Sequence, residues 1–297
     1  MKNLKKKKFL DPNLKNKLRT VEGKIQLFEF NGNMLPLPTE IEISESGTCN
    51  RSCAFCPRSA AGFEDKKEFI TSELHQKLCD QLKEIDYEGT IRYSGFVEPL
   101  LDKNIFNLID KARKCLPKVN IEIVTNGDPL NLKRLNRLFE VGLNKILISA
   151  YDSKEDADKL ENLCKKANLD ENQYIVRHRY YSEDSDFGIT LSNRAGLMEN
   201  AEFKIESLKE PLKKPCYIPS YTFFLDYQGD VLICPHDWGK KIILGDLNKE
   251  NFLDIWFNKK SMQVRKMLNS SNRNFKPCNV CDVIGTLMGE KNSSYFN

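Results

Sequence analysis

The sequence predicts an α/β protein with one main domain of repeated strand–helix units, followed by a smaller module that has its own cysteines. Two observations predict this class. Between residues 40 and 181, apolar residues recur by turns at strand spacing and at helix spacing. After residue 181 this rhythm gives way to a glycine-containing hairpin pattern, short helical stretches and a closing pair of cysteines.

The composition describes a globular chain without a membrane segment. Its 297 residues suffice for one large and one small domain, and 40% hydrophobic with 30% charged residues is typical of folded proteins. It contains no apolar run of about eighteen residues, and the N-terminus lacks the apolar region of a secretory signal. We therefore expect a cytoplasmic protein that makes no membrane contact.

Residues 1–38 are expected to form a basic leader. Lys2 and the run 5–8 are lysines, which favours a solvated tail, with a basic arm for nucleic acid or a membrane surface as the alternative. The net charge is only +4, and the rest of the chain shows no stripe of alternating aromatic and basic residues. These features argue against nucleic acid as a partner.

The main domain is expected to span residues 39–200. Strands are predicted at 40–44, 90–95, 120–126, 145–150 and 173–180, and helices at 71–85, 104–116, 132–141 and 153–168. Strands that alternate with helices of this length indicate βαβ units and a mostly parallel sheet. Periodicity alone leaves open whether this sheet is a partial barrel or doubly wound.

The second module is expected to span residues 201–297. Its hairpin joins strand segments at 221–227 and 231–234 through a turn that contains Gly229, and helical pieces follow at 253–257 and 261–268.

Cys49, Cys53 and Cys56 lie directly after the first predicted strand, where α/β sheets build their sites. Three thiolates on a four-iron cluster leave one iron open to a small molecule. Structural zinc requires four closed ligands, and the nearest candidates for a fourth, His75 and Cys79, belong to the following helix. An open [4Fe–4S] cluster is therefore favoured over zinc.

The Cys-x-x-x-Cys-x-x-Cys spacing resembles the defining motif of radical S-adenosylmethionine (radical SAM) enzymes, and the resemblance extends over about residues 40–181. It implies a partial (β/α)6 barrel and a [4Fe–4S] cluster whose open iron binds SAM. The positions that match the family's further SAM contacts are Phe55, Gly95, Glu98, Asn126 and Ser149. Val97 stands where the family usually has glycine, so the loop around Glu98 departs from the common pattern.

In this family a reduced cluster cleaves SAM, and the resulting 5′-deoxyadenosyl radical removes a hydrogen atom from the substrate. The resemblance therefore implies a small-molecule substrate and an electron donor such as flavodoxin or ferredoxin.

The second cysteine set consists of Cys216, Cys234, Cys278 and Cys281. Four thiolates close a site, so the spacing alone allows either a zinc ribbon or an iron–sulfur cluster. The segment resembles twitch, the shortened form of the SPASM domain of radical SAM enzymes, which implies a second, auxiliary [4Fe–4S] cluster. The remaining cysteines at 79, 115 and 164 fall in predicted helices and are expected in the core.

The resemblance to twitch proteins implies oxidation of a secondary alcohol of a sugar or aminocyclitol, with the auxiliary cluster as electron acceptor. Arg194 and His236 are the expected substrate contacts. Arg177 and Arg179 are further candidates, which strand alternation places on the face opposite His178. The alternatives are a radical epimerase of a sugar or peptide, a peptide maturase, and a non-catalytic iron–sulfur or zinc-binding protein.

Overall fold

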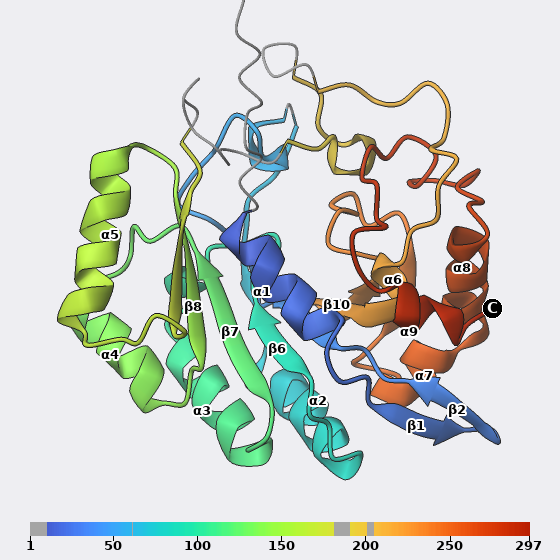
Figure 1. Ribbon diagram of the computed structural model, residues 1–297, viewed down its shortest axis with the longest axis horizontal. Coiled ribbons are helices and arrows are strands. Elements are labelled where there is room, and N and C mark those ends of the chain that lie inside the picture. Colours follow the sequence, from blue (N-terminus) through green and yellow to red (C-terminus); the bar gives the residue numbers. More distant parts are fainter. Residues whose placement is uncertain (1–10, 61, 181–190, 201–204) are drawn as a thin grey trace, which may run out of the picture.

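The computed structural model describes residues 11–60, 62–180, 191–200 and 205–297 (Figure 1). Its centre is an eight-stranded sheet with the order β12-β11-β10-β3-β6-β7-β8-β9. The six neighbouring strands from β10 to β9 are parallel, whereas β11 and β12 continue the sheet in antiparallel fashion at one edge. The predicted α/β class, with a curved, mostly parallel sheet of partial-barrel type, is confirmed.

The strands of this sheet are β3 (Glu40–Ser44), β6 (Thr90–Tyr93), β7 (Asn120–Thr125), β8 (Lys145–Ala150), β9 (Tyr174–His178), β10 (Thr222–Asp226), β11 (Asp230–Leu232) and β12 (Ile243–Asp246). The helices α2 (Ser72–Glu84), α3 (Ile105–Cys115), α4 (Leu132–Glu140) and α5 (Lys154–Lys166) connect successive parallel strands and cover the outer face of the sheet. Short strands β4 (Ser46–Gly47) and β5 (Lys66–Phe69) pair outside this sheet.

The outer face of the sheet is apolar because alternate strand residues point toward the helices. Ile41 and Ile43 of β3 are fully buried in the core, as are Leu78 and Leu82 of α2. The helix α2 begins one residue after the predicted start, because Thr71 is its N-cap: the Thr71 hydroxyl accepts a hydrogen bond from the Leu74 amide at 3.1 Å.

The inner face carries buried charges instead. Arg92 of β6 forms ion pairs with Glu40 of β3 and with Glu122 of β7, the latter at 2.7 Å, and all three side chains are 1% exposed. Burial alone raises the pKa of Glu40, but the charges of Arg92 and Lys17 outweigh burial and lower the pKa. The pKa of Glu122 is lowered for the same reason, because Arg92 outweighs its burial.

Part of the predicted leader folds onto this inner face. The helix α1 (Pro12–Val21) crosses the sheet in front of β6 and β7 (Figure 1), and a hairpin of β1 (Leu27–Phe30) and β2 (Asn33–Pro36) follows. The Asn16 side chain donates to Glu122 at 3.1 Å and accepts from Lys145 at 2.8 Å. The lysine cluster at residues 2–8 lies outside the described residues.

The C-terminal segment is joined to the same sheet. Strand β10 pairs with β3 in register from Thr222 opposite Glu40 to Asp226 opposite Ser44, so the predicted hairpin extends the main sheet. The helices α6 (Ile218–Tyr221), α7 (Phe252–Phe257), α8 (Lys259–Asn269) and α9 (Glu290–Ser294) pack beside it. The boundary at residues 200 and 201 stays a prediction.

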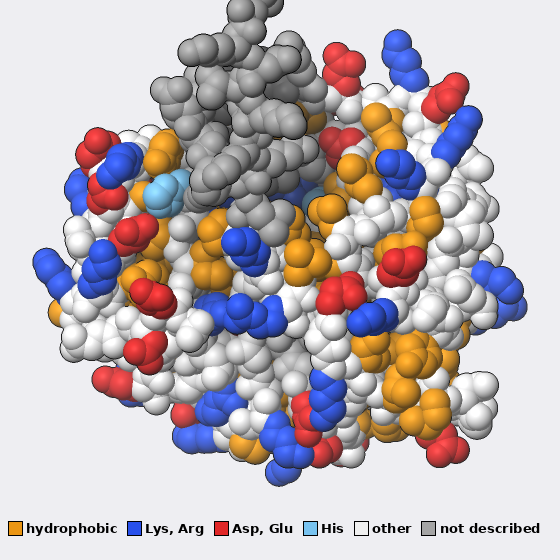
Figure 2. All heavy atoms as spheres, viewed as in Figure 1, with side chains coloured by type: hydrophobic (Ala, Val, Ile, Leu, Met, Phe, Trp, Pro, Cys, Tyr) orange, Lys and Arg blue, Asp and Glu red, His pale blue; other side chains and the backbone are white. Residues whose placement is uncertain are grey.

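Figure 2 shows acidic and basic side chains interspersed over the face that α1 occupies, with apolar side chains between them. Within the described part of the chain, none of the helices has the length and apolar character that crossing a membrane requires.

We expect Arg92→Leu to lower the free energy of unfolding by about 3–5 kcal/mol at neutral pH, because two buried carboxylates lose their partner. In the wild type the carboxylates have lowered pKa values, so their contribution is present above the ordinary value of 4.5 and is lost as pH falls through the folded-state pKa. In the variant the unpaired, buried carboxylates take up protons, so stability should rise as pH falls toward about 5.

Urea denaturation at several pH values measures both effects. The matched control is Arg137→Leu, which removes an exposed pair with Glu140 on α4 and should change stability by less than about 0.5 kcal/mol. Equal losses in the two variants would contradict a special role of Arg92.

Candidate active site

The first cysteine set lies in the loop between β4 and β5. Cys49, Cys53 and Cys56 are all partly exposed, and the amide of Cys56 donates to the carbonyl of Cys53 at 2.9 Å, which turns the loop back on itself. Burial raises the pKa of all three thiols, in the case of Cys53 to about 11, where the nearby Cys56 adds to the rise. Cluster ligation therefore has to displace protons from these thiols.

Arg51 attaches this loop to the carboxyl ends of two strands. Its guanidinium forms hydrogen-bonded ion pairs with Asp128, after β7, and with Asp152, after β8, at distances between 2.5 and 2.8 Å. These bonds to Asp128 and Asp152 raise the pKa of Arg51 further above its ordinary value. A fork-shaped guanidinium that holds two carboxylates fixes orientation as well as position.

Arg58 attaches the loop to the end of β6, the strand beside β7. Its guanidinium donates to the carbonyls of Gly47, at 3.0 Å, and of Phe96, and it also pairs with Asp65. Arg58 thus holds the cysteine loop at β6, and Arg51 holds it at β7 and β8.

Glu98 braces the loops that follow β6 and β7. Its buried carboxylate accepts hydrogen bonds from the Thr125 hydroxyl at 2.6 Å, from the Asn126 amide at 2.7 Å and from the Leu100 amide at 3.1 Å. Burial raises the pKa of Glu98, and these donors partly oppose the rise. Both carboxylate oxygens are therefore engaged by the protein, and the SAM contact of Glu98 stays a prediction.

Asn126 connects this brace to the cysteine loop. Its side-chain amide donates to Asn50 at 2.8 Å and lies 3.9 Å from the sulfur of Cys49. Gly95 has a φ of +102°, and a Cβ there would lie 2.9 Å from the Phe224 ring. The structure thus brings Asn126 against the cysteine loop and Glu98 against Asn126, whereas Gly95 lies beside Phe224; their contacts with SAM stay predictions.

The other two predicted SAM positions lie toward β8. The Phe55 ring, inside the cysteine loop, packs against the Tyr151 ring with centroids 5.3 Å apart. The Ser149 hydroxyl, at the end of β8, accepts from Arg177 at 3.3 Å. Their contacts with SAM stay predictions.

Arg177 and His178 at the end of β9, and Arg179 directly after it, divide between the two faces of the strand as expected. Arg177 and Arg179 both pair with Asp11, which caps α1. His178 lies on the other face, 3.3 Å from Glu161 of α5.

Arg194 lies in a tight turn between the two cysteine sets. Arg194 and Ala195 have φ values of +47° and +54°, a left-handed conformation that is strained for residues other than glycine. The neighbouring Asn193 holds the turn. Its side chain donates to the Val280 carbonyl at 2.6 Å, and its backbone N–H donates to the Asp282 carboxylate at 2.9 Å. The turn is therefore fastened to the closing Cys-x-x-Cys segment.

His236 lies near Arg194, two residues after Cys234. Burial lowers the pKa of His236 to about 3, and the positive charge of Arg194 adds to the effect, so the imidazole is neutral at ordinary pH. Its buried Nδ1 has no hydrogen-bond partner among the described residues. The charge of Arg194 also acts on the thiol of Cys56, which places Arg194 within electrostatic reach of the first cysteine set and of His236.

The second cysteine set is gathered in the C-terminal segment. Burial raises the pKa of Cys216, Cys234, Cys278 and Cys281, and the other three thiols of the set add to the rise at Cys234. Gly285 lies directly against the first thiol, and a Cβ there would collide with the sulfur of Cys216. Within the described residues these thiols do not converge as the ligands of a single metal ion would, and four thiols are the number that a fully ligated [4Fe–4S] cluster requires.

The other cysteines lie elsewhere. Cys79 and Cys164 are buried in the core as predicted, and Cys115 is partly buried against it.

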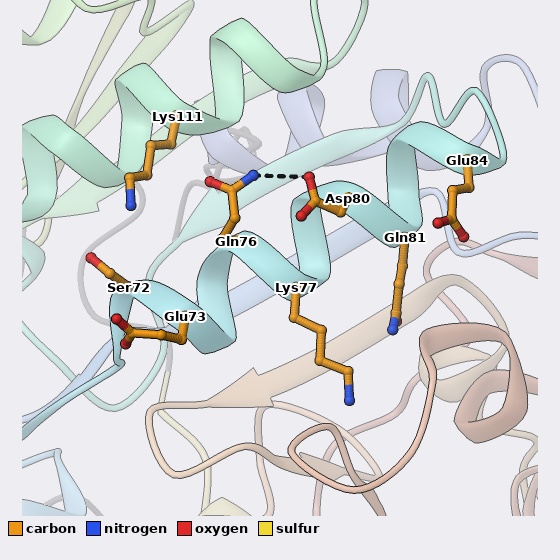
Figure 3. A pocket seen from close by; sticks show the side chains of 8 residues that line it. All are labelled: Ser72, Glu73, Gln76, Lys77, Asp80, Gln81, Glu84 and Lys111. Carbon is orange, nitrogen blue, oxygen red and sulfur yellow. Dashed lines mark hydrogen bonds between the residues drawn. The ribbon is translucent and has the colours of Figure 1, made fainter.

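A separate surface hollow lies over the exposed side of α2. It is lined by Ser72, Glu73, Gln76, Lys77, Asp80, Gln81, Glu84 and Lys111 (Figure 3). Lys77 is already engaged there, because its ammonium group donates to the carbonyls of Leu247 and Glu250 at 2.7 and 2.9 Å. The hollow belongs to the outer helical layer and contains none of the cysteines.

Several residues that shape this site were not predicted. Asp128 and Asp152 follow the carboxyl ends of predicted strands, a position that marks functional residues in α/β sheets. Their position in the sequence could therefore have identified Asp128 and Asp152 as site residues. Arg51 and Asp282 carry no such signal, because their partners lie between 77 and 101 residues away in the chain.

Two family models match this chain. Residues 43–179 match the radical SAM superfamily, and residues 216–282 match SPASM, described as an iron–sulfur cluster-binding domain. Together with the cysteine loop and the parallel sheet, these matches identify a radical SAM oxidoreductase that uses a [4Fe–4S] cluster with SAM and an auxiliary iron–sulfur cluster.

The relatives narrow the family further. The chain is 30% identical, over 78% of its length and 88% of the relative, to the S-adenosyl-L-methionine-dependent 2-deoxy-scyllo-inosamine dehydrogenase of Niallia circulans. It therefore belongs to the family of that enzyme. A GTP 3′,8-cyclase of Mesorhizobium japonicum is 27% identical over 44% of this chain and 39% of the relative.

The solved structures agree with this placement. The crystal structure of BtrN in complex with AdoMet and 2-DOIA superposes with a TM-score of 0.70 at 27% identity, covering 86% of this chain and 98% of BtrN. The structure of anSMEcpe with bound AdoMet has a TM-score of 0.53 at 13% identity, covering 88% of this chain and 92% of that one, and shows the shared fold alone. The predicted radical SAM and twitch resemblance is thereby confirmed.

We expect Arg51→Gln to lose the SAM-binding cluster to an iron chelator roughly three- to tenfold faster than the wild type. The reason is that the variant loses two ion pairs worth up to about 1 kcal/mol each. Loss of absorbance under anaerobic chelation measures the rate, with the auxiliary cluster as internal reference. Arg113→Gln is the matched control, since Arg113 donates to Gly142 and Pro117 at the other end of the sheet. An unchanged rate in Arg51→Gln would contradict the proposed anchoring.

Proposed function

We propose that this chain oxidises a secondary alcohol of an aminocyclitol, or of a closely similar sugar, to a ketone. The observation that carries the proposal is the 30% identity to a 2-deoxy-scyllo-inosamine dehydrogenase over 88% of that enzyme. The structure of BtrN, whose title names 2-DOIA as a bound molecule, supports it with near-complete coverage.

In this proposal Cys49, Cys53 and Cys56 hold the first cluster, and the four cysteines of the second set hold the auxiliary cluster. When bound, the first cluster would supply the electron that cleaves SAM to a 5′-deoxyadenosyl radical, and the auxiliary cluster would accept the electron that leaves the oxidised substrate. Two hydrogens leave the carbinol group, one as an atom to the radical and the other as a proton. The protein has to orient the substrate and exclude water.

Arg194 and His236 are proposed to contact the substrate. Arg194 lies within electrostatic reach of Cys56 and of His236, and its strained turn is fastened to the auxiliary-cluster segment. His236 offers a buried ring nitrogen that no described residue occupies. Such a nitrogen is suited to a substrate hydroxyl, since buried polar groups in proteins are normally hydrogen-bonded.

The SAM side of the site is proposed to consist of Phe55, Gly95, Glu98, Asn126 and Ser149. Its support is that all five flank the cysteine loop or end the strands beside it.

A flavodoxin or ferredoxin is the proposed electron donor, and the cytoplasm the proposed location. In support, all ten cysteines are free in the structure, as expected in a reducing compartment.

The direct test is an anaerobic assay of the reconstituted protein with SAM, a reductant and a panel of aminocyclitols and sugars, including 2-deoxy-scyllo-inosamine. We expect 5′-deoxyadenosine to form only with a true substrate, in step with a ketone product. Deuterium at the oxidised carbon should appear in the 5′-deoxyadenosine. Iron analysis should give about eight irons per chain, from two four-iron clusters.

Deuterium transfer without a ketone, with solvent hydrogen regained at the same carbon, would contradict the proposal and indicate an epimerase. Absence of 5′-deoxyadenosine with every aminocyclitol and sugar in the panel would refute the proposed substrate class.

We expect Arg194→Gln to raise the substrate KM about ten- to a hundredfold, because a charge-assisted hydrogen bond is worth about 1.5–3 kcal/mol. Binding of SAM should stay unchanged, since the cysteine loop is untouched. Steady-state kinetics measure KM, and Arg137→Gln on the exposed face of α4 is the control. An unchanged KM would remove Arg194 from the substrate site.

A further inference from the structure

Arg273 lies buried beside the second cysteine set, in the segment between α8 and Cys278. Its side chain is 2% exposed. The guanidinium donates four hydrogen bonds, all to backbone carbonyls: to Lys214 at 3.0 Å, Pro215 at 2.7 Å, Val283 at 2.7 Å and Ile284 at 2.6 Å.

These four carbonyls come from two separate parts of the chain. Lys214 and Pro215 directly precede Cys216, the first ligand candidate, whereas Val283 and Ile284 closely follow Cys281, the last. Arg273 therefore ties the first and last ends of the auxiliary site together. The planar fork of arginine suits this role, because lysine offers fewer donors in a fixed geometry.

The guanidinium of Arg273 also lies beside the first ligand candidate. It donates at 2.7 Å to the carbonyl of Pro215, the residue that directly precedes Cys216. Arginine carries a positive charge at neutral pH, so this contact places a buried positive charge next to the auxiliary site.

We propose that Arg273 is a positioning residue of the auxiliary cluster, which holds the two ligand-bearing segments together and raises the reduction potential of the cluster. Reduction adds one negative charge to the cluster, and a buried positive charge nearby stabilises the reduced form more than the oxidised form. Hydrogen bonds and charges around a cluster are known determinants of its potential. A raised potential makes the cluster a better electron acceptor, which is what the proposed alcohol oxidation requires.

The inference rests on the presence of the auxiliary cluster, and its acceptor role comes from the proposed function. Its test does not use turnover, so failure of either can be recognised separately. The auxiliary cluster is isolated in a chain whose Cys49, Cys53 and Cys56 are replaced by alanine. Iron per chain, the rate of iron loss to a chelator, and an EPR-monitored redox titration are then measured.

Two variants separate the two roles of Arg273. Arg273→Gln removes the charge, and we expect at least a tenfold lower ratio of reduced to oxidised cluster at a fixed potential, which is about 59 mV for a one-electron couple. Arg273→Lys keeps the charge but loses donors. It should release iron at least threefold faster than the parent while its reduced-to-oxidised ratio stays within threefold.

Arg265→Gln is the matched control. Arg265 lies in the preceding helix α8 and is equally buried, and it donates to the carbonyls of Pro219 and Trp256 and stacks on the Trp256 ring at 3.7 Å. Its loss should destabilise the fold without changing the potential of the cluster. An equal shift in Arg265→Gln and Arg273→Gln would overturn the proposal, and so would an unchanged potential in Arg273→Gln.

If Arg273→Gln fails to retain the cluster while Arg265→Gln retains it, the holding role is supported and Arg273→Lys decides the other role. A reduced-to-oxidised ratio that changes by more than threefold in the lysine variant would then overturn the role of the charge. Failure of both glutamine variants to retain the cluster would overturn the specific holding role. The cluster would then be lost on replacement of either buried arginine, and not of Arg273 in particular.

Discussion

The parallel pairing of β10 with β3 joins residues that are 182 positions apart, and the arrangement of both cysteine sets depends on it. Strand β3 leads into the loop of Cys49, Cys53 and Cys56, whereas β10 and β11 lie between Cys216 and Cys234. Because five residue pairs hold the two strands in one register, the second set has a fixed position relative to the first. The site is therefore organised by one continuous sheet.

Within this frame, arginines do most of the positioning. Arg92 neutralises buried carboxylates on the inner face, Arg51 holds the cysteine loop to β7 and β8, and Arg273 joins the ends of the auxiliary segment. Each guanidinium offers several donors in a fixed plane, so one side chain can connect segments that no continuous strand or helix joins. Such contacts allow irregular loops to hold ligand residues in defined places.

The sequence allowed the local elements to be predicted well, because helix and strand periods are local properties. The strand Lys145–Ala150 has the predicted bounds, the helix α2 falls within the predicted range 71–85, and the cysteine spacing indicated the class of chemistry. The pairing of β10 with β3 could not be predicted, since the sequence of a strand does not indicate which other strand it pairs with. The helix α1 was missed because its buried Asn13 and Asn16 look like surface residues until Glu122 supplies a partner for Asn16.

The contacts of α1 also have a consequence for the order in which the chain folds. Asn16 bonds to residues 106 and 129 positions further on, and Glu22 accepts from the amide of Gly289, 267 positions away. Closing such a long loop costs chain entropy, and this cost must be met before the contact can stabilise the fold. The helix α1 thus finds its final place late in folding, after the distant C-terminal residues that it contacts have been made.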